Sequence, residues 1–191
     1  MHISEGVLSL PVLITGWTGT VLGLAYSLKK LTTDQIPKMG ILAAVFFVAS
    51  LIHVPIGPSS AHLLLNGLVG LLLGIFAIPT IFIGLLLQAL LFQFGGLTTL
   101  GANTVIMSFP AVIAGLIFHK RQSPLLAGIL SALTVLTSAI LAGLALGCSG
   151  EQFIPVAKLL VVAHLPIAGV EAIITYFIIS FILKTRSELL N

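Results

Sequence analysis

The chain has 191 residues, of which 58% are hydrophobic and only 7% are charged, and its formal net charge is +3 at pH 7. Since soluble domains carry about 25% charged residues, this composition excludes an ordinary soluble globule. Cys148 is the single cysteine, which excludes a disulfide framework within the chain, and no stretch has the basic character of a nucleic-acid-binding patch. We therefore expect a polytopic membrane protein in the lipid bilayer, with a single domain over residues 1–191.

The N-terminal segment MHISEGVLSL does not have the form of a signal peptide. Signal peptides carry a positively charged n-region, whereas the first lysine is Lys29 and Glu5 stands where a positive charge is expected. Removal of the initiator methionine generally needs a small second residue, and His2 is large. We expect the segment to be mature sequence that keeps Met1.

Apolar runs that could cross a membrane follow along the whole chain, and we expect each to be helical, because a helix satisfies its backbone polar groups within the segment. The third, fourth and fifth are short for a hydrocarbon core of about 30 Å, so we expect them to borrow flanking residues or to be partly re-entrant. The predicted fold class is therefore all-α, a transmembrane bundle of about seven helices. The runs cover residues 8–28, 40–57, 61–78, 80–94, 104–118, 124–147 and 160–183.

Lysine and arginine residues between these runs predict the orientation, because cytoplasmic loops are enriched in them. Seven alternating passes place the loops after the first, fifth and seventh runs on the same side. The N-terminus is then expected outside and the C-terminus in the cytoplasm, with Lys158 as the exception. The basic residues of these three loops are Lys29, Lys30 and Lys38, then Lys120 and Arg121, then Lys184 and Arg186.

Polar residues within the apolar runs are candidates for function, since placing them in lipid costs free energy unless they are paired or used. Taken singly, most are explained equally well as boundary histidines or as hydrogen-bonding groups between helices. Glu171 is balanced between a structural network and a site. The other candidates are His53, His62, Asn66, Gln88, Gln93, Asn103 and His164.

The pair Met1-His2 has the donor atoms for a transition metal. The α-amine of Met1, the amide nitrogen of His2 and its Nδ1 can surround one cation in a plane, closing a five-membered and a six-membered ring. One further imidazole completes a planar set of four nitrogens, a geometry typical of Cu(II) or Ni(II). Residues 1–7 extend to at most about 23 Å, so the terminus can fold back toward His62 in the outer half of the bundle.

Three segments together resemble the CbiM/NikM family, the cobalt- and nickel-specific substrate-binding (S) components of energy-coupling factor (ECF) transporters, a type of ABC importer. The resemblance implies a six-helix core with an added N-terminal helix, and Ni²⁺ or Co²⁺ as the transported substrate. It also implies a multi-pass protein of the prokaryotic plasma membrane, which is the inner membrane in a Gram-negative cell. The segments are MHISEGVLS at 1–9, HVPIGPSSAHLLLNG at 53–67 and QALLFQFGGLTTLGANT at 88–104.

The resemblance further implies that the metal is bound by the Met1 amine, by the amide nitrogen and imidazole of His2, and by one histidine before the third run. That histidine maps to His62, with His53 as a second candidate. Some relatives carry a histidine where this chain has Gln93. Further metal-binding or ligand-orienting residues are expected among His53, Asn66, Gln93, Asn103 and Glu171.

The chain contains no G-x-x-x-x-G-K-[ST] phosphate loop, so we expect a transporter subunit that is not itself an enzyme. The resemblance implies a transmembrane coupling (T) subunit and two cytoplasmic ATPases as partners, with a small accessory membrane subunit in some systems. A self-contained divalent-metal channel or secondary carrier is the alternative. An intramembrane hydrolase would need G-x-S-x-G or H-E-x-x-H, and both are missing, whereas a purely structural subunit would bind no metal.

Overall fold

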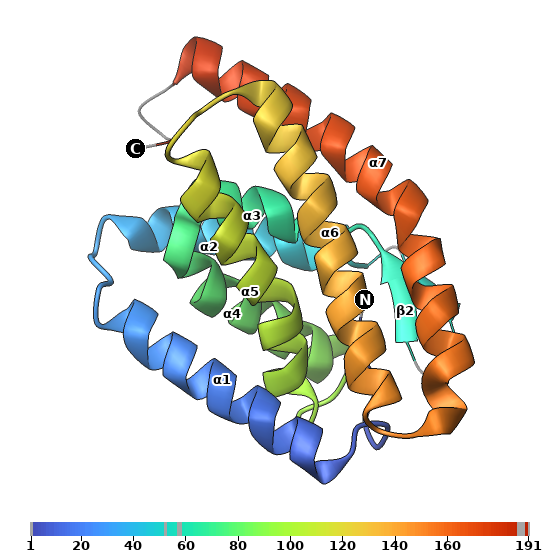
Figure 1. Ribbon diagram of the computed structural model, residues 1–191. Helices are drawn as coiled ribbons and strands as arrows, with labels where there is room; N and C mark the ends of the chain where they lie inside the picture. Colours follow the sequence, from blue (N-terminus) through green and yellow to red (C-terminus); the bar gives the residue numbers. More distant parts are fainter. Residues whose placement is uncertain (1, 52, 57–58, 187–189, 191) are drawn as a thin grey trace.

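The computed structural model describes residues 2–51, 53–56, 59–186 and 190, with only the backbone described between 53 and 61. Within these residues the fold is a helical bundle with one β-hairpin (Figure 1). Two 3-10 turns, η1 and η2, lead into α4 and α7. The helices are α1 Leu10–Leu28, α2 Gln35–Ala49, α3 Asn66–Leu73, α4 Ala77–Phe92, α5 Leu100–Phe118, α6 Pro124–Gly147 and α7 Ile154–Thr185; the turns are η1 Gly74–Phe76 and η2 Glu151–Phe153.

The described chain does not have the seven separate spans that the apolar runs predict. Five helical stretches are long and apolar enough to cross a membrane, with α3, η1 and α4 counted as one stretch over 66–92. The sixth apolar helix, α2, has only 15 residues. The run expected at 61–78 is no span of its own, because α3 has eight residues, which is about 12 Å of helix. Hydropathy identifies this run as apolar, but it does not predict that helix α3 ends before Gly74, where φ is +54°.

The all-α class is confirmed, and the described residues add one short β-hairpin between the second and third runs. Strand β1, His53–Ile56, pairs antiparallel with β2, Ser59–His62, and the register places His53 opposite His62. Pro55 has no N–H to donate to a helix and favours an extended residue before it, which agrees with a strand at this position.

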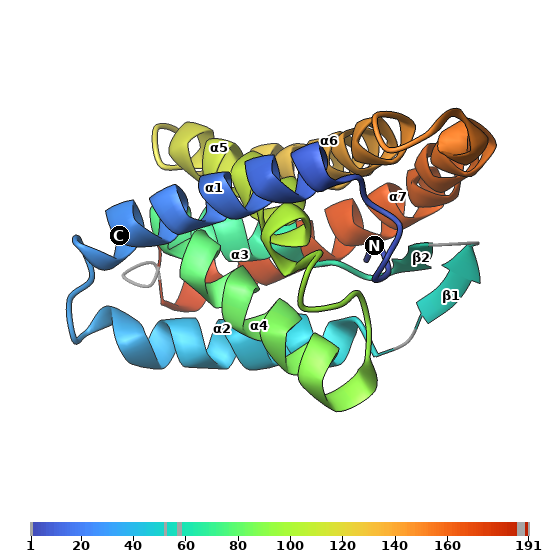
Figure 2. The ribbon, with the colours of Figure 1, turned by 90° about the horizontal axis from the view of Figure 1, so that it is seen from below.

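The chain reverses between two ends of the bundle, which Figures 1 and 2 show from two directions. The basic end carries the α1–α2 connection, the α5–α6 connection and the end of α7, so the lysine and arginine residues of the three predicted loops gather there. The hairpin end carries the N-terminal segment, β1 and β2, residues 93–99 and the α6–α7 connection. At that end Ser9 N donates to Ser149 Oγ at 3.0 Å, which joins the start of α1 to the end of α6.

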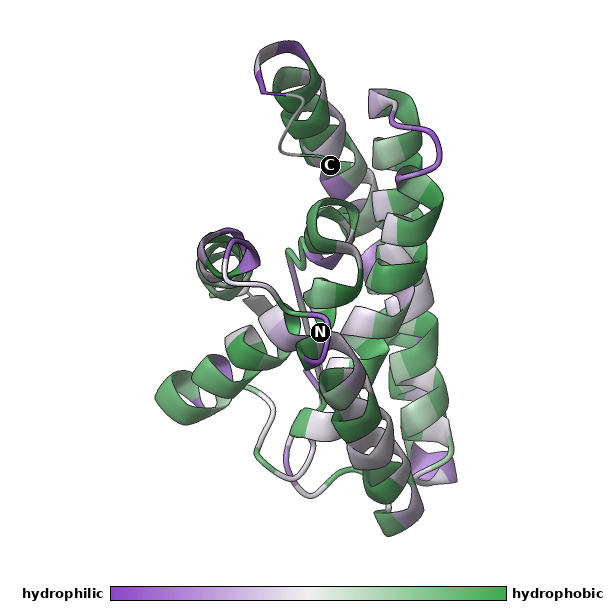
Figure 3. Cartoon of the chain, turned by 90° about the vertical axis from the view of Figure 1, so that its left-hand side faces the viewer, coloured by the Kyte–Doolittle hydropathy of each residue, from purple (hydrophilic) through white to green (hydrophobic). Residues whose placement is uncertain are grey.

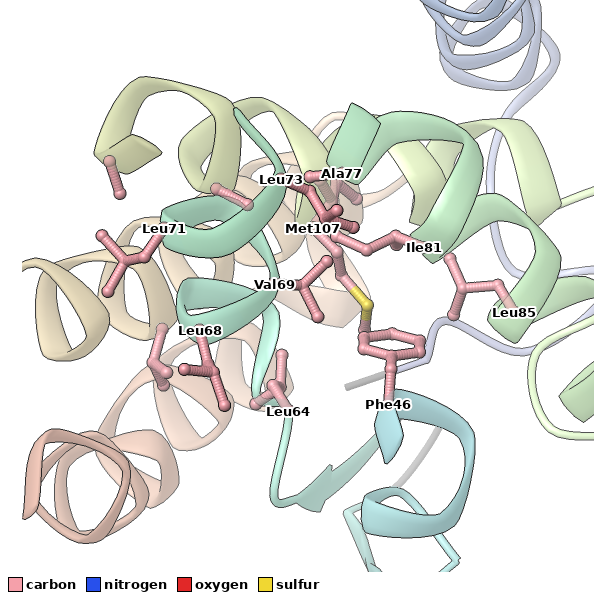
Figure 4. Close-up of a cluster of buried hydrophobic side chains, with 14 of the residues drawn as sticks. Phe46, Leu64, Leu68, Val69, Leu71, Leu73, Ala77, Ile81, Leu85 and Met107 are labelled. Carbon is pink, nitrogen blue, oxygen red and sulfur yellow. The ribbon is translucent and has the colours of Figure 1, made fainter. Parts of the chain in front are cut away.

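The hydrophobic core surrounds α3, whose residues are all buried, and one part of it lies between α2, α4 and α5. Phe46, Ile81, Leu85 and Met107 come from these three helices, converge in one cluster and are at most 2% exposed (Figure 4). Large apolar side chains also cover the outside of the helices, and the hydrophilic residues collect at the connections (Figure 3). This distribution is the one expected of a protein whose outer surface contacts lipid.

Helix α3 crosses α5 so closely that a side chain at Gly70 has no room. A Cβ built on Gly70 would lie 2.0 Å from the carbonyl oxygen of Ala111. We expect Gly70→Ala to lower the free energy of unfolding by about 1–3 kcal/mol, because the backbones must separate. The measurement is thermal unfolding of the detergent-solubilised protein. Gly40→Ala is the matched control, since nothing lies within 4 Å of a Cβ there, and an equal loss in both variants would contradict the prediction.

Candidate metal site

The N-terminal segment is held inside the hairpin end by residues of the motif GGLTTLGAN. Ile3 N donates to Asn103 Oδ1 and Asn103 Nδ2 donates to Ile3 O, each at 3.1 Å, so one amide side chain satisfies both backbone groups of Ile3. Two residues further on, Glu5 N donates to Gly95 O at 3.2 Å, and Glu5 Oε1 accepts from Thr98 N at 3.2 Å. These contacts fix the backbone beside His2, whose side chain is only 4% exposed.

The paired glycines of this motif make room for the segment. Gly95 has a φ of +80°, a conformation that favours glycine, as expected of a turn. A Cβ on Gly96 would lie 1.4 Å from Glu5 Oε2. Larger residues at Gly95 or Gly96 would therefore strain the turn or displace the N-terminal segment.

His2 and His62 lie side by side, with nearly parallel rings, in the buried space that this arrangement creates. Their rings stack with centroids 4.6 Å apart and an interplanar angle of 22°. His2 Nδ1 and His62 Nε2 are 3.0 Å apart, and His62 is only 3% exposed. The structure thus brings together two histidines that are 60 residues apart in the sequence.

The remaining ring nitrogens of both histidines face carbonyl oxygens. His62 Nδ1 donates to the backbone oxygen of Leu63 at 2.8 Å, and His2 Nε2 donates to Gln88 Oε1 at 2.5 Å. Gln88 is oriented in turn by Ser50, because its Nε2 donates to Ser50 Oγ. Since a carbonyl oxygen only accepts, the protons of both neutral rings are on these nitrogens. His2 Nδ1 and His62 Nε2 then present lone pairs to each other.

A metal cation placed between the two facing lone pairs would bind both nitrogens at once. Burial lowers the pKa of His62 well below its usual range, which disfavours the imidazolium form. Nitrogen ligands at right angles, each about 2.1 Å from one metal, would be about 3.0 Å apart. The observed separation of 3.0 Å matches adjacent ligands of a single ion.

Among the described side chains, this site has two nitrogen donors, the imidazoles of His2 and His62. No group of three or more His, Cys, Asp or Glu side chains suited to a metal occurs within the residues that the structure describes. Within the described residues, the backbone amide of His2 is a further nitrogen donor beside the two imidazoles. The amide nitrogen of His2, which is a predicted ligand, belongs to the same residue as one of the imidazoles. Met1, whose amine is the other predicted ligand, lies outside the described residues.

The other predicted site residues have different places. The side chain of His53 lies outside the described residues, although its backbone pairs with His62. Gln93 ends α4 with a φ of +57° and an exposed side chain. Asn66 is buried and donates to Met107 O and Ser138 Oγ, each at 3.0 Å, tying α3 to α5 and α6. Asn103 holds Ile3, as described above.

Sequence reasoning missed the role of Gln88 and left Glu171 open. The sequence predicts Gln88 as a hydrogen-bonding group between helices; it does bond to Ser50 at the end of α2, and it also contacts His2 directly. Its position one turn before the end of α4, at the same end as the histidines, was the available signal. Glu171 contacts the backbone just after His62, since its Oε1 accepts from Leu64 N and from Leu65 N.

The sequence of the chain is similar to those of known metal-transport proteins. The family model described as the cobalt uptake substrate-specific transmembrane region matches residues 2–189. A protein of Haemophilus influenzae is 40% identical, with 100% of this chain and 97% of that protein covered. The cobalt transport protein CbiM of Sorangium cellulosum is 31% identical, with 100% of this chain and 95% of that protein covered.

A solved structure agrees with the fold. The crystal structure of a truncated transition metal transporter superposes with a TM-score of 0.86 at 29% sequence identity, and the match covers 96% of this chain and 99% of that one. The match of the family model over nearly the whole chain, together with these relatives, shows that the chain belongs to the CbiM family of cobalt- and nickel-transport membrane proteins.

Proposed function

We propose that the chain is the substrate-binding S component of an ECF-type importer, which captures one Ni²⁺ or Co²⁺ ion at the hairpin end. The ligands are His2 Nδ1, His62 Nε2, the amide nitrogen of His2 and the amine of Met1. The observation that carries this proposal is the pair of buried imidazole nitrogens, 3.0 Å apart, whose protons are held on the opposite sides of both rings. Soft to intermediate divalent ions favour such nitrogen donors.

The hairpin end faces the outside in this proposal, and the basic end faces the cytoplasm of a prokaryotic cell. The gathering of the lysine and arginine loops at one end supports this orientation. The metal is then captured outside and released inward. Because the sequence has no phosphate loop, inward transport is driven by partners, which are a transmembrane T subunit, two cytoplasmic ATPases and, where present, a small accessory membrane subunit.

Reconstitution into vesicles separates this function from a self-contained channel or carrier. We expect the purified chain to bind Ni²⁺ or Co²⁺ but to give no sustained flux into vesicles that contain a metal-sensitive dye. Flux is expected only after the T subunit, the ATPases and ATP are added. The control is the complete assembly with a non-hydrolysable ATP analogue. Robust flux through the chain alone would show a channel or carrier instead.

A further inference from the structure

A carboxylate on α7 caps the start of α3. Glu171 is fully buried, and its Oε1 accepts hydrogen bonds from Leu64 N and, at 2.9 Å, from Leu65 N. These amides lie just before α3, where the first N–H groups of a helix have no partner within the helix. The positive end of the helix dipole favours a carboxylate there. Residues about 106 positions apart in the chain are thus joined at one oxygen atom.

The short segment that Glu171 holds also fixes the ring of His62. Leu63 O accepts from His62 Nδ1 at 2.8 Å, and the next two residues donate their amides to Glu171. Leu65 has a φ of +53°, which is uncommon for a residue other than glycine and persists only where the surroundings impose it. The two bonds to Glu171 stabilise this conformation, and with it the direction in which Leu63 O points.

The carboxylate has no other hydrogen bond in the described part of the chain. Its second oxygen, Oε2, is buried without a hydrogen-bond partner there, as is His164 Nε2 two turns earlier on α7. Strands β1 and β2 contact α7 along this stretch. If α7 moves relative to α3, no other hydrogen bond among the described residues replaces the two bonds between Glu171 and the 63–65 segment.

From these contacts we infer that Glu171 is a positioning residue that keeps His62 in its metal-binding orientation and makes metal affinity depend on the position of α7 relative to the 63–65 segment. The inference rests on the proposed function. Helix α7 runs for 32 residues from the hairpin end to the basic end (Figures 1 and 2). A displacement of α7 at the basic end would remove the acceptor from Leu64 and Leu65, release His62 and open the site at the hairpin end.

Substitutions at Glu171 test this inference with two readouts. Ni²⁺ affinity is measured by titration calorimetry, and Cu²⁺ serves as a spectroscopic probe of how many nitrogens bind. We expect Glu171→Ala to weaken Ni²⁺ binding about 10- to 100-fold, the range for residues that orient a ligand. Its Cu²⁺ spectrum should lose one nitrogen, as in His62→Ala, and adding His62→Ala should cause no further loss.

Two conservative variants distinguish position from charge. Glu171→Gln keeps the length and an oxygen with two lone pairs, so we expect wild-type nitrogen coordination. Glu171→Asp keeps the charge but is one methylene shorter, so we expect it to behave like Glu171→Ala. Thr175→Val is the matched control, because Thr175 lies one turn further on the same buried face and bonds to Ser131 at 3.0 Å instead.

The outcomes separate this inference from the proposed function. A folded Glu171→Ala variant with unchanged affinity and unchanged nitrogen coordination would overturn the inference. The inference would also be overturned if Glu171→Asp kept the wild-type nitrogen coordination while Glu171→Gln lost one nitrogen. If Glu171→Ala does not fold, these two variants alone test the inference. If the wild-type protein itself shows no coordination that depends on His62, the proposed function fails instead.

Discussion

Acylation of the Met1 α-amine is expected to lower the affinity for Ni²⁺ or Co²⁺ on the order of 1,000-fold, since loss of a ligand should exceed the 10- to 100-fold effect of a residue that only orients one. The amide formed from that amine binds a metal only after it loses its N–H proton, and it has no free amine beside it to anchor the metal and promote that loss, as the Met1 amine does for the amide nitrogen of His2. A free α-amine is in general less basic than a lysine side chain, so a limiting amount of reagent near pH 7 modifies the terminus first. Titration calorimetry of the modified protein gives the affinity.

The control for this experiment is acylation in the presence of saturating metal, followed by removal of the metal. Coordination should protect the amine, so this sample should regain nearly full affinity. An unmodified affinity after complete acylation of the terminus would eliminate the amine as a ligand. The two imidazoles would then need other partners.

His62→Ala is expected to have the second largest effect, a loss of about 100-fold or more in affinity, because it removes a ligand and leaves the lone pair of His2 Nδ1 without its partner. The N-terminal chelate of three nitrogens should remain. Its presence would appear as a shift of the Cu²⁺ absorption to lower energy, with one nitrogen fewer in the electron paramagnetic resonance spectrum.

His119→Ala is the matched control for this variant. His119 follows the end of α5 at the basic end and is exposed, so its loss should leave metal binding unchanged. Equal losses in the two variants would contradict the assignment of His62. They would also indicate that the measured affinity comes from adventitious histidine binding.

The class of fold could be predicted from the sequence, whereas the β-hairpin and the short helix α3 within it could not. Composition and hydropathy identify a membrane bundle because lipid imposes a strong and local constraint on every spanning residue. The positions of α1, α5, α6 and α7 follow from it closely. The hairpin at 53–62 and the short α3 do not, because both depend on contacts with α7 and α5 that are distant in the sequence.

The residues of the candidate site likewise fall into those that the sequence could identify and those that it could not. His2 and His62 could be singled out because their chemistry is specific and because the motifs around them resemble a known family. The contribution of Gln88 could not, since an amide inside a helix has the same sequence signal whether it meets a histidine or a neighbouring helix. The interaction of Glu171 with Leu64 and Leu65 involves backbone amides, which no sequence pattern identifies.

In the proposed site, the nitrogen donors of His2 and His62 would also determine which ions are excluded. Mg²⁺ and Ca²⁺ are hard cations that require cages of oxygen atoms, and the two imidazoles offer them none. Discrimination against these abundant ions therefore lies in donor chemistry and does not need a pore of exact diameter. On the proposed function, a cell in hard water would take up a trace metal through this site without having to out-compete calcium.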